Sequence, residues 1–139
     1  MNYTLTISEL KDKGYRLTKA RKEIVKIFSE SKKPLTASEV KKKLIQSGQS
    51  VNKTTIYREL KFLDEKKYLK KVYIDPSEVS YESSDLKHHH HLVCEECGKI
   101  FVITDCLVND LEKNIRKKKG FIVRRHNLEF YGICKDCSN

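Results

Sequence analysis

The sequence predicts an α+β protein with an N-terminal winged helix-turn-helix domain followed by a small α/β domain that contains a four-cysteine zinc site. Two observations divide the 139 residues in this way. Residues 1–74 hold 19 Lys and Arg against 8 Asp and Glu, a net charge of +11, whereas residues 75–139 carry a net charge of −1. Every histidine and cysteine lies in the second part. We therefore expect a basic domain in the first part of the chain and a metal-binding domain in the second.

Short amphipathic helices are expected first along the chain. The segments Thr6–Glu9 and Thr36–Glu39 both fit the capping-box pattern that starts a helix, and Thr18 precedes apolar residues at helical spacing. Asn52 can cap a further helix that runs from Lys53 to about Lys67. In this last helix Ile56, Leu60 and Leu63 form one apolar stripe.

Two strands follow the helices. The segments KYLKKVYID and EVSYES flank Asp75-Pro76-Ser77, a pattern typical of strands joined by a turn. Helices followed by such a hairpin predict a winged helix-turn-helix, with the Lys53–Lys67 helix placed to enter the major groove of DNA.

The polar face of the Lys53–Lys67 helix carries the side chains that would meet DNA. Thr54, Arg58 and Lys61 lie roughly opposite the apolar stripe, and Tyr57 lies on its flank. A helix face that is merely solvated would usually alternate Lys with Glu, whereas this one offers hydroxyl and guanidinium groups to bases and phosphates. Together with the net charge of +11, this predicts DNA binding.

Two Cys-x-x-Cys pairs give the most specific signal in the chain. Cys94 with Cys97, and Cys134 with Cys137, can supply four thiolates to a tetrahedral zinc ion, and Gly98 allows the tight turn of a zinc knuckle. Because 36 residues separate the pairs, a folded α/β unit has to bring them together. A disulfide or a redox pair would explain one Cys-x-x-Cys but not two. A shell of four cysteines has no open position, so this zinc would be structural.

Four consecutive histidines, His88 to His91, run directly into the first cysteine pair. On a strand, His89 and His91 would lie on one face and His88 and His90 on the other, so that one run could serve two metal sites. The alternative is a surface cluster with only adventitious metal affinity. Candidate companion ligands on the chain are Glu82, Asp85, Cys106, Asn109, Asp110 and His126.

His126 and Cys106 each have two readings. His126 is expected on a strand face with Ile122, Leu128 and Phe130, either as a buried core residue or as a ligand. Cys106 is expected in the first turn of a helix at 106–119 capped by Asp105, either as a small buried filler or as a ligand or redox sensor.

Composition excludes several classes of protein. No apolar run approaches the roughly 20 residues of a transmembrane helix, and the N-terminus lacks the pattern of a signal peptide. A cytoplasmic location is expected, which disfavours disulfides. No nucleophile–base arrangement or H-E-x-x-H motif indicates an enzyme. A metal-storage or chaperone module could use the same ligands, but it would not need the basic N-terminal part.

The chain resembles the ferric uptake regulator superfamily of bacterial metal-responsive transcription factors. The resemblance is carried by Thr54–Leu60, by His88–Lys99, and by His126 with Tyr131-Gly132 and Cys134–Cys137. It implies a winged-helix DNA-binding domain at 1–80, a hinge at 81–86 and a small α/β, metal-binding dimerisation domain at 87–139. It also implies that Tyr57 and Arg58 lie on the recognition helix and that Arg16 and Arg21 help hold the DNA.

The resemblance also implies three metal sites. The four paired cysteines match the structural zinc site, Glu82, His89 and His91 match the interdomain sensing site, and His88, His90 and His126 match a second site in the dimerisation domain. Cys106 and the unbroken His run are most similar to the zinc uptake regulator branch. Pro34, Val102, His90 and Asn109 stand where iron or peroxide sensors carry a histidine or acidic residue.

These observations predict a zinc-dependent repressor of metal-uptake genes that binds a palindromic DNA operator as a homodimer. Zn²⁺ is the expected regulatory metal, with Fe²⁺ or Mn²⁺ as alternatives, and an iron- or peroxide-responsive regulator is the alternative function. Metal at Glu82, His89 and His91 would favour the DNA-binding arrangement through its differential affinity for that arrangement.

Overall fold

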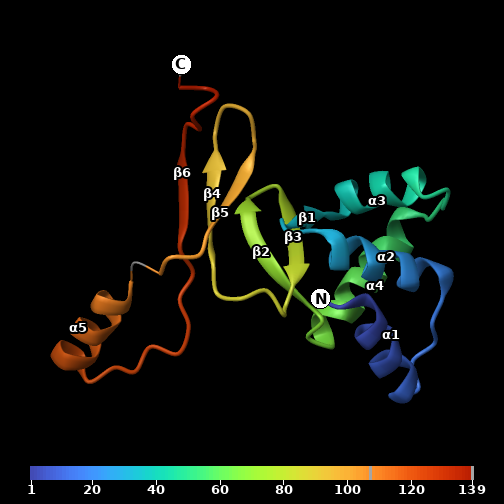
Figure 1. Ribbon diagram of the computed structural model, residues 1–139, viewed down its shortest axis with the longest axis horizontal. Helices are drawn as coiled ribbons and strands as arrows, with labels where there is room; N and C mark the ends of the chain where they lie inside the picture. The colour runs from blue at the N-terminus through green and yellow to red at the C-terminus, as the bar shows by residue number, and fades with distance from the viewer. Residues whose placement is uncertain (107, 139) are drawn as a thin grey trace. The chain divides into compact units, whose positions relative to one another are not determined.

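The computed structural model describes residues 1–106 and 108–138, and it divides into two compact units, Met1–Leu86 and Lys87–Asn139. Figure 1 labels the helices and strands of both units. No described helix is both long and apolar enough to span a bilayer.

Four helices form most of the first unit, and side-chain caps define where each begins. The caps are Asn2, Thr18, Thr36 and Asn52, and each side-chain oxygen accepts a hydrogen bond from a backbone N–H in the first turn. Thr36 and Glu39 form the complete capping box that the sequence predicts. The helices are α1 (Tyr3–Asp12), α2 (Lys19–Glu30), α3 (Ala37–Gln46) and α4 (Lys53–Glu65).

The start of α1 corrects the sequence analysis. The segment Thr6–Glu9 does not begin this helix, because Asn2 caps it four residues earlier and Thr6 is buried inside it. The Asn2 side chain accepts the Leu5 N–H at 3.1 Å, so a cap outside the capping-box pattern supplies the helix start.

The apolar faces of these helices meet in one core. Ile56, Leu60 and Leu63 of α4 are essentially inaccessible to solvent, as the predicted stripe requires. They pack among residues of α1, α2 and α3, including Leu10, Phe28, Val40 and Leu44. The exposed face of α4 is therefore fixed by the burial of the opposite one.

A three-stranded antiparallel sheet completes the first unit. The predicted hairpin is present as β2 (Leu69–Asp75) and β3 (Glu78–Ser83), and a short strand that the sequence did not predict, β1 (Leu35–Thr36), pairs with β3. The order is β1-β3-β2. Figure 1 shows the hairpin beside the helices, which is the arrangement of a winged helix.

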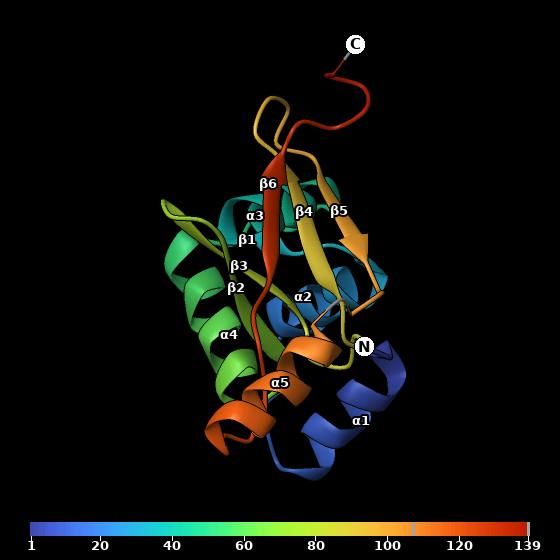
Figure 2. The ribbon, with the colours of Figure 1, turned by 90° about the vertical axis from the view of Figure 1, so that its left-hand side faces the viewer.

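The second unit is built on another three-stranded sheet. Its elements are β4 (His90–Cys94), β5 (Ile100–Ile103), α5 (Asn109–Lys119) and β6 (Glu129–Gly132). Figure 2 shows β4 between its two neighbours, with β5 antiparallel to β4 and β6 parallel to it. Because β5 runs antiparallel to β4, it returns the chain to the starting end of β4. The chain then passes through α5 and begins β6 at that same end of the sheet.

Two expectations about the second unit are wrong. The helix α5 begins at Asn109 rather than Cys106, and its N-cap is Val108 without a side-chain hydrogen bond, so Asp105 is not its cap. Leu107, expected on the apolar stripe of that helix, lies outside the described residues. His126 precedes β6 and does not lie on a strand.

Candidate metal centres and nucleic-acid interface

The sheet of the second unit brings the two cysteine pairs to one end. Cys94 is the last residue of β4 and lies opposite Gly132, the last residue of β6. Cys97 follows in the turn after β4, where Gly98 adopts a positive φ of 68°, and the second pair follows β6. Because β4 and β6 run parallel, their ends carry the pairs in the same direction. The parallel strands thus bring together two cysteine pairs that 36 residues separate in the sequence.

The geometry of the four sulfur atoms fits a tetrahedral zinc ion. All four Sγ atoms lie within 4.8 Å of one another, and those of Cys97 and Cys134 are 3.8 Å apart. Four sulfurs placed about 2.3 Å from a central zinc ion would be about 3.8 Å from each other. All five cysteines of the chain are free, so no disulfide competes for these thiols.

Hydrogen bonds shift the pKa values of the thiols in this cluster in opposite directions. Backbone N–H donors, with that of Cys134 foremost at 3.3 Å from the Cys94 Sγ, lower the pKa of Cys94 to about 6. Hydrogen bonds with the neighbouring thiols of Cys134 and Cys97 raise the pKa of Cys137 to about 12. The first thiolate therefore forms easily and the last with difficulty, which is the behaviour of a donor set that needs a cation to ionise fully.

The histidine run divides into two pairs, as side-chain alternation predicts. His88 Nε2 lies 3.1 Å from His90 Nε2, and His89 Nε2 lies 3.2 Å from His91 Nε2. The His89 ring also has its Nδ1 2.6 Å from the Lys87 carbonyl, which directs its Nε2 away from the backbone. One short segment thus presents two separate pairs of imidazole nitrogens.

The His88 and His90 pair belongs to a larger group. His126 Nε2 lies 3.0 Å from His88 Nε2, and Cys106 Sγ lies 3.6 Å from His126 Nε2. The four donor atoms all lie within 4.8 Å of one another. Burial, and then the charges of His88 and His126, lower the pKa of His90, so its neutral, metal-binding form is favoured.

The residues of the predicted sensing site come from both units. Glu82 lies on β3 of the first unit, where its carboxylate forms an ion pair with Lys70 at 3.0 Å and is almost inaccessible to solvent. His89 and His91 belong to the second unit. A shared ion at these three residues is taken up below as a proposal.

The recognition helix presents the predicted DNA-binding side chains to solvent. Thr54, Tyr57, Arg58 and Lys61 are exposed on α4, and the Lys53 ammonium lies 5.7 Å from the centre of the Tyr57 ring. Arg16 is exposed in the loop between α1 and α2. Thr54, Tyr57, Arg58, Lys61 and Arg16 remain candidates for DNA contacts.

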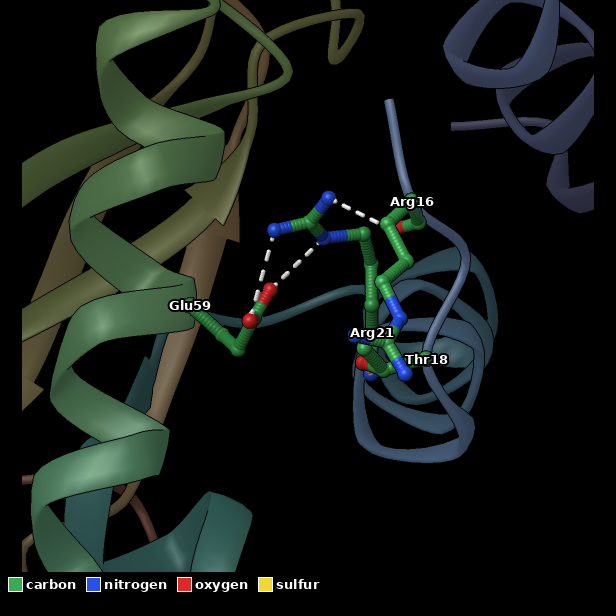
Figure 3. A network of polar contacts seen from close by, with 4 residues as sticks. All are labelled: Arg16, Thr18, Arg21 and Glu59. Atoms are coloured by element: carbon green, nitrogen blue, oxygen red, sulfur yellow. Dashed lines mark hydrogen bonds and ion pairs between the residues drawn. The ribbon is translucent and has the colours of Figure 1, made fainter. Parts of the chain in front are cut away.

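Arg21 is placed differently from what the sequence led us to expect. Its guanidinium donates to the Glu59 carboxylate at 2.7 and 3.3 Å and to the Arg16 carbonyl at 2.7 Å (Figure 3). It also lies 3.8 Å from the centre of the Phe62 ring. The side chains of Arg21 and Glu59 are only 11% and 6% exposed. Arg21 therefore braces α4 and the loop that carries Arg16, and its charge is not turned toward the surface as an unpaired DNA contact would be.

Sequence reasoning missed two acidic residues of these networks. Glu59 falls three residues after Ile56, within the buried stripe of α4, and a carboxylate at such a position is itself a signal of a buried partner. Glu112 Oε1 lies 2.7 Å from His126 Nδ1, but nothing in the sequence distinguishes it from the other acids near the start of α5.

A winged helix joined to a small sheet with Cys and His clusters defines a class of metal-binding, DNA-binding proteins. The sequence pattern of the Ferric uptake regulator family matches residues 12–131. The chain therefore belongs to the ferric uptake regulator family, and it is a metal-responsive transcription regulator rather than an enzyme. Regulators of this family bind DNA and form dimers.

Individual relatives agree with this assignment over nearly the whole chain. The chain is 32% identical over 131 residues to the ferric uptake regulation protein of Bordetella parapertussis, with 94% of each chain covered. The Helicobacter pylori ferric uptake regulator superposes with a TM-score of 0.82 at 26% identity, covering 98% of this chain and 90% of that one. The Francisella tularensis regulator, solved with iron, gives 0.81 at 29% identity, covering 91% and 96%.

We expect replacement of Arg21 by Ala to destabilise the first unit by about 3 kcal/mol, because it leaves the Glu59 carboxylate buried without its partner. Chemical denaturation followed by the helical circular dichroism signal, which is dominated by α1 to α4, measures the change. Lys61→Ala, which removes an exposed cation from α4, is the control. A loss in R21A no larger than that of the control would show that the pair does not brace the fold.

We expect Cys134→Ser to lose about one tightly held zinc per chain, because it removes a sulfur ligand from a four-thiol shell. Elemental analysis of dialysed protein measures the loss. Lys99→Met is the control, since it breaks the 2.8 Å ion pair with Asp136 beside the cluster and leaves all four thiols. Equal zinc content in C134S and the unaltered protein would contradict this assignment.

Proposed function

We propose that this protein is a zinc-responsive repressor of metal-uptake genes that acts in the cytoplasm as a homodimer on a palindromic DNA operator. In this proposal the four paired cysteines hold structural Zn²⁺, and Glu82, His89 and His91 hold the regulatory ion. The observation that carries the proposal is the division of the histidine run into two pairs. His88 and His90 are grouped with His126 and Cys106, which leaves His89 and His91 as donors for a separate site.

The structural role of the first ion follows from its donors. Four thiolates satisfy tetrahedral zinc completely, so no position is left for substrate or water. Such an ion contributes its binding free energy to folding, because the cluster does not exist in the unfolded chain. Its position after β4 and β6 makes it a cross-link between the two strand ends.

The sensing role of the second ion follows from where its ligands lie along the chain. Glu82 stands seven positions before His89, and the boundary between the two units falls between them. An ion that binds a carboxylate on β3 and two imidazoles around β4 would couple the DNA-binding unit to the metal-binding unit. Such an ion favours one arrangement of the units only to the extent that it binds better there.

The regulatory metal is the finer point of the proposal. Two imidazoles and one carboxylate suit Zn²⁺ and also Fe²⁺, so this donor set alone does not select one ion. Zinc is favoured by the second group of donors, which consists of His88, His90, His126 and Cys106. Among the described residues, this group contains three imidazoles and a thiol but no carboxylate. Nitrogen and sulfur donors suit zinc better than manganese.

The structure of the Helicobacter pylori relative is described as having three functional metal-binding sites. Within the described part of the second unit, the four-thiol cluster and the two histidine pairs are three sets of donors, which match that number. The correspondence supports a regulator whose structural, sensing and auxiliary sites are separate.

DNA recognition is assigned to α4. Its exposed Thr54, Tyr57, Arg58 and Lys61 lie opposite a buried stripe, so the helix can enter a groove without disturbing the core. The net charge of +11 over residues 1–74 supplies the sequence-independent attraction to phosphates. Arg16 and Arg21 are proposed to help from the α1–α2 region, Arg16 by contact and Arg21 by holding the Arg16 backbone.

Zinc is expected to raise operator affinity by tenfold or more, on the order of 1.4 kcal/mol, through ligands on both units. Fluorescence anisotropy with a labelled promoter fragment, at fixed salt, measures the response to Zn²⁺, Fe²⁺ and Mn²⁺. We expect His89→Ala to abolish the gain while retaining the structural zinc of the four cysteines. Glu65→Gln, which changes an exposed carboxylate on α4 that is no candidate ligand, should keep the gain.

Equal operator affinity with and without added zinc would refute the proposed zinc response. A gain produced by Fe²⁺ and not by Zn²⁺ would instead assign the chain to iron regulation.

Substitutions on α4 should separate base recognition from phosphate contact. We expect Arg58→Ala to weaken operator binding by about 1–3 kcal/mol and to relax sequence preference. Lys61→Ala should weaken binding to all sequences equally and reduce the slope of log affinity against log salt by about 1. Glu65→Gln on the same helix is the control. Identical salt slopes for all three variants would argue against α4 as the DNA-binding element.

A further inference from the structure

Cys106 is the fifth cysteine of the chain, and it has no place in the four-thiol cluster. It lies in the segment between β5 and α5, partly exposed, with its sulfur 3.6 Å from His126 Nε2. His88 and His90 complete the group of four donor atoms. The sulfur is therefore grouped with three imidazole nitrogens that come from other parts of the chain.

The distances within this group are those of a tetrahedral ion with nitrogen and sulfur ligands. With zinc–nitrogen bonds of about 2.0–2.1 Å and a zinc–sulfur bond of about 2.3 Å, a tetrahedron places nitrogen and sulfur about 3.6 Å apart. The Cys106 to His126 distance is 3.6 Å. The nitrogen–nitrogen distances of 3.0 and 3.1 Å are slightly shorter than the roughly 3.3 Å of the same tetrahedron.

Three neutral imidazole rings, which carry one ring N–H each, cannot satisfy every contact in this arrangement. His126 Nδ1 hydrogen-bonds Glu112, so its Nε2 turns a lone pair toward His88. His90 hydrogen-bonds the backbone of Leu128, and its Nε2 also faces His88. The single Nε2 position of His88 can donate at most one hydrogen, which leaves one pair of nitrogen lone pairs opposed. A cation between the rings removes that repulsion.

Glu112 supplies the outer contact that metal-binding histidines ordinarily have. Its carboxylate lies 2.7 Å from His126 Nδ1, and a carboxylate in this position fixes both the tautomer and the orientation of the ring. Glu112 lies on α5, which buries none of its described residues. The helix is thus joined to the donors by Glu112 and by the two segments that flank it, which carry Cys106 and His126.

We infer that Cys106 is the fourth ligand of a centre formed with His88, His90 and His126, and that this centre takes zinc-like ions and fastens α5 to β4. Three nitrogens and one sulfur favour Zn²⁺ or Co²⁺ over Mn²⁺, which prefers oxygen ligands. The inference deepens the proposed zinc response. It rests on the proposed function only in assuming that zinc is the ion that the protein binds in the cell. Asn109 lines the pocket that also contains His88, Cys106 and His126. Its side chain offers an amide and no carboxylate, so Cys106 supplies the anionic ligand.

Cobalt provides a direct test, because a thiolate bound to Co²⁺ gives a near-ultraviolet charge-transfer band that oxygen and nitrogen ligands do not. The full-length protein, with its four-thiol cluster already filled with zinc, is titrated with Co²⁺ and followed by difference absorption. We expect the unaltered protein to show this band with the visible absorption of tetrahedral cobalt. Cys106→Ser should lose the charge-transfer band and weaken cobalt binding by tenfold or more.

Glu112→Gln serves as the matched variant that keeps every ligand. It should retain the charge-transfer band and weaken cobalt binding by roughly tenfold, because the amide no longer accepts as strongly from His126. Circular dichroism checks that both variants fold. An unchanged band in C106S, or a Cys106 that zinc does not protect from alkylation in the unaltered protein, would overturn the assignment.

Hydrogen exchange tests the mechanical part of the inference. Zinc should slow amide exchange in α5 of the unaltered protein, and this protection should be lost in C106S while β4 and β6 stay protected. Equal exchange in α5 with and without zinc would overturn the fastening. The result is separate from the proposed function, because failure of zinc to raise operator affinity would leave the cobalt band and the protection of α5 unaffected.

Discussion

The second unit has to keep its shape with very little apolar core, and the arrangement of its polar residues follows from that shortage. Among its described residues, Cys94 is the only hydrophobic residue that is buried, whereas the first unit encloses a continuous core that includes Leu10, Phe28 and Leu60. A core in a unit of about 50 residues contributes only marginal stability, and metals or oligomerisation commonly add to it. The sequence offers two sources of additional stability. One is metal binding by clustered polar side chains within the unit, and the other is association with a second subunit.

Both sources of stability can be assigned to particular residues. The four-thiol cluster joins the ends of β4 and β6, and the His88 group joins β4 to the segments that flank α5. The apolar side chains that the sheet leaves exposed include Phe101, Phe130 and Tyr131, each about 40–50% exposed. Regulators of this family form dimers. A second copy of the chain would cover these exposed apolar side chains.

Local signals predicted the first unit well because its helices depend on neighbours in sequence. The Thr36 capping box, the Asn52 cap and the Ile56–Leu63 stripe each involve residues within one or two turns, and each is found as expected. The errors arise where distant parts of the chain decide. Leu35 and Thr36 become a strand only because Tyr81 and Ser80 lie beside them. The start of α1 is an error of another kind, because its Asn2 cap is local and of a favoured residue type but was passed over for the capping-box pattern at Thr6.

The same distinction applies to the candidate sites. The spacing within Cys-x-x-Cys and the alternation of four histidines are local, so the four-thiol cluster and the two histidine pairs could be predicted. Arg21 could not be assigned its partner, because Glu59 is 38 positions away, and Glu112 meets His126 only through the loop that follows α5. The approach of Cys106 to His126 depends on that same loop, so the sequence left ligand and filler as equal readings.

Placing the ligands of one proposed ion on both sides of a domain boundary has a thermodynamic consequence. Glu82 already has Lys70 as a partner at 3.0 Å, so an ion has to compete with an existing pair for this carboxylate. The ion then adds to regulation only the difference between its affinity with the carboxylate and its affinity for the histidines alone. To change a population from 1:99 to 99:1 this difference must reach about 5.5 kcal/mol. In the proposed switch Lys70 would reduce this net gain, so the carboxylate of Glu82 would set both the sensitivity of the switch and the metal concentration at which it responds.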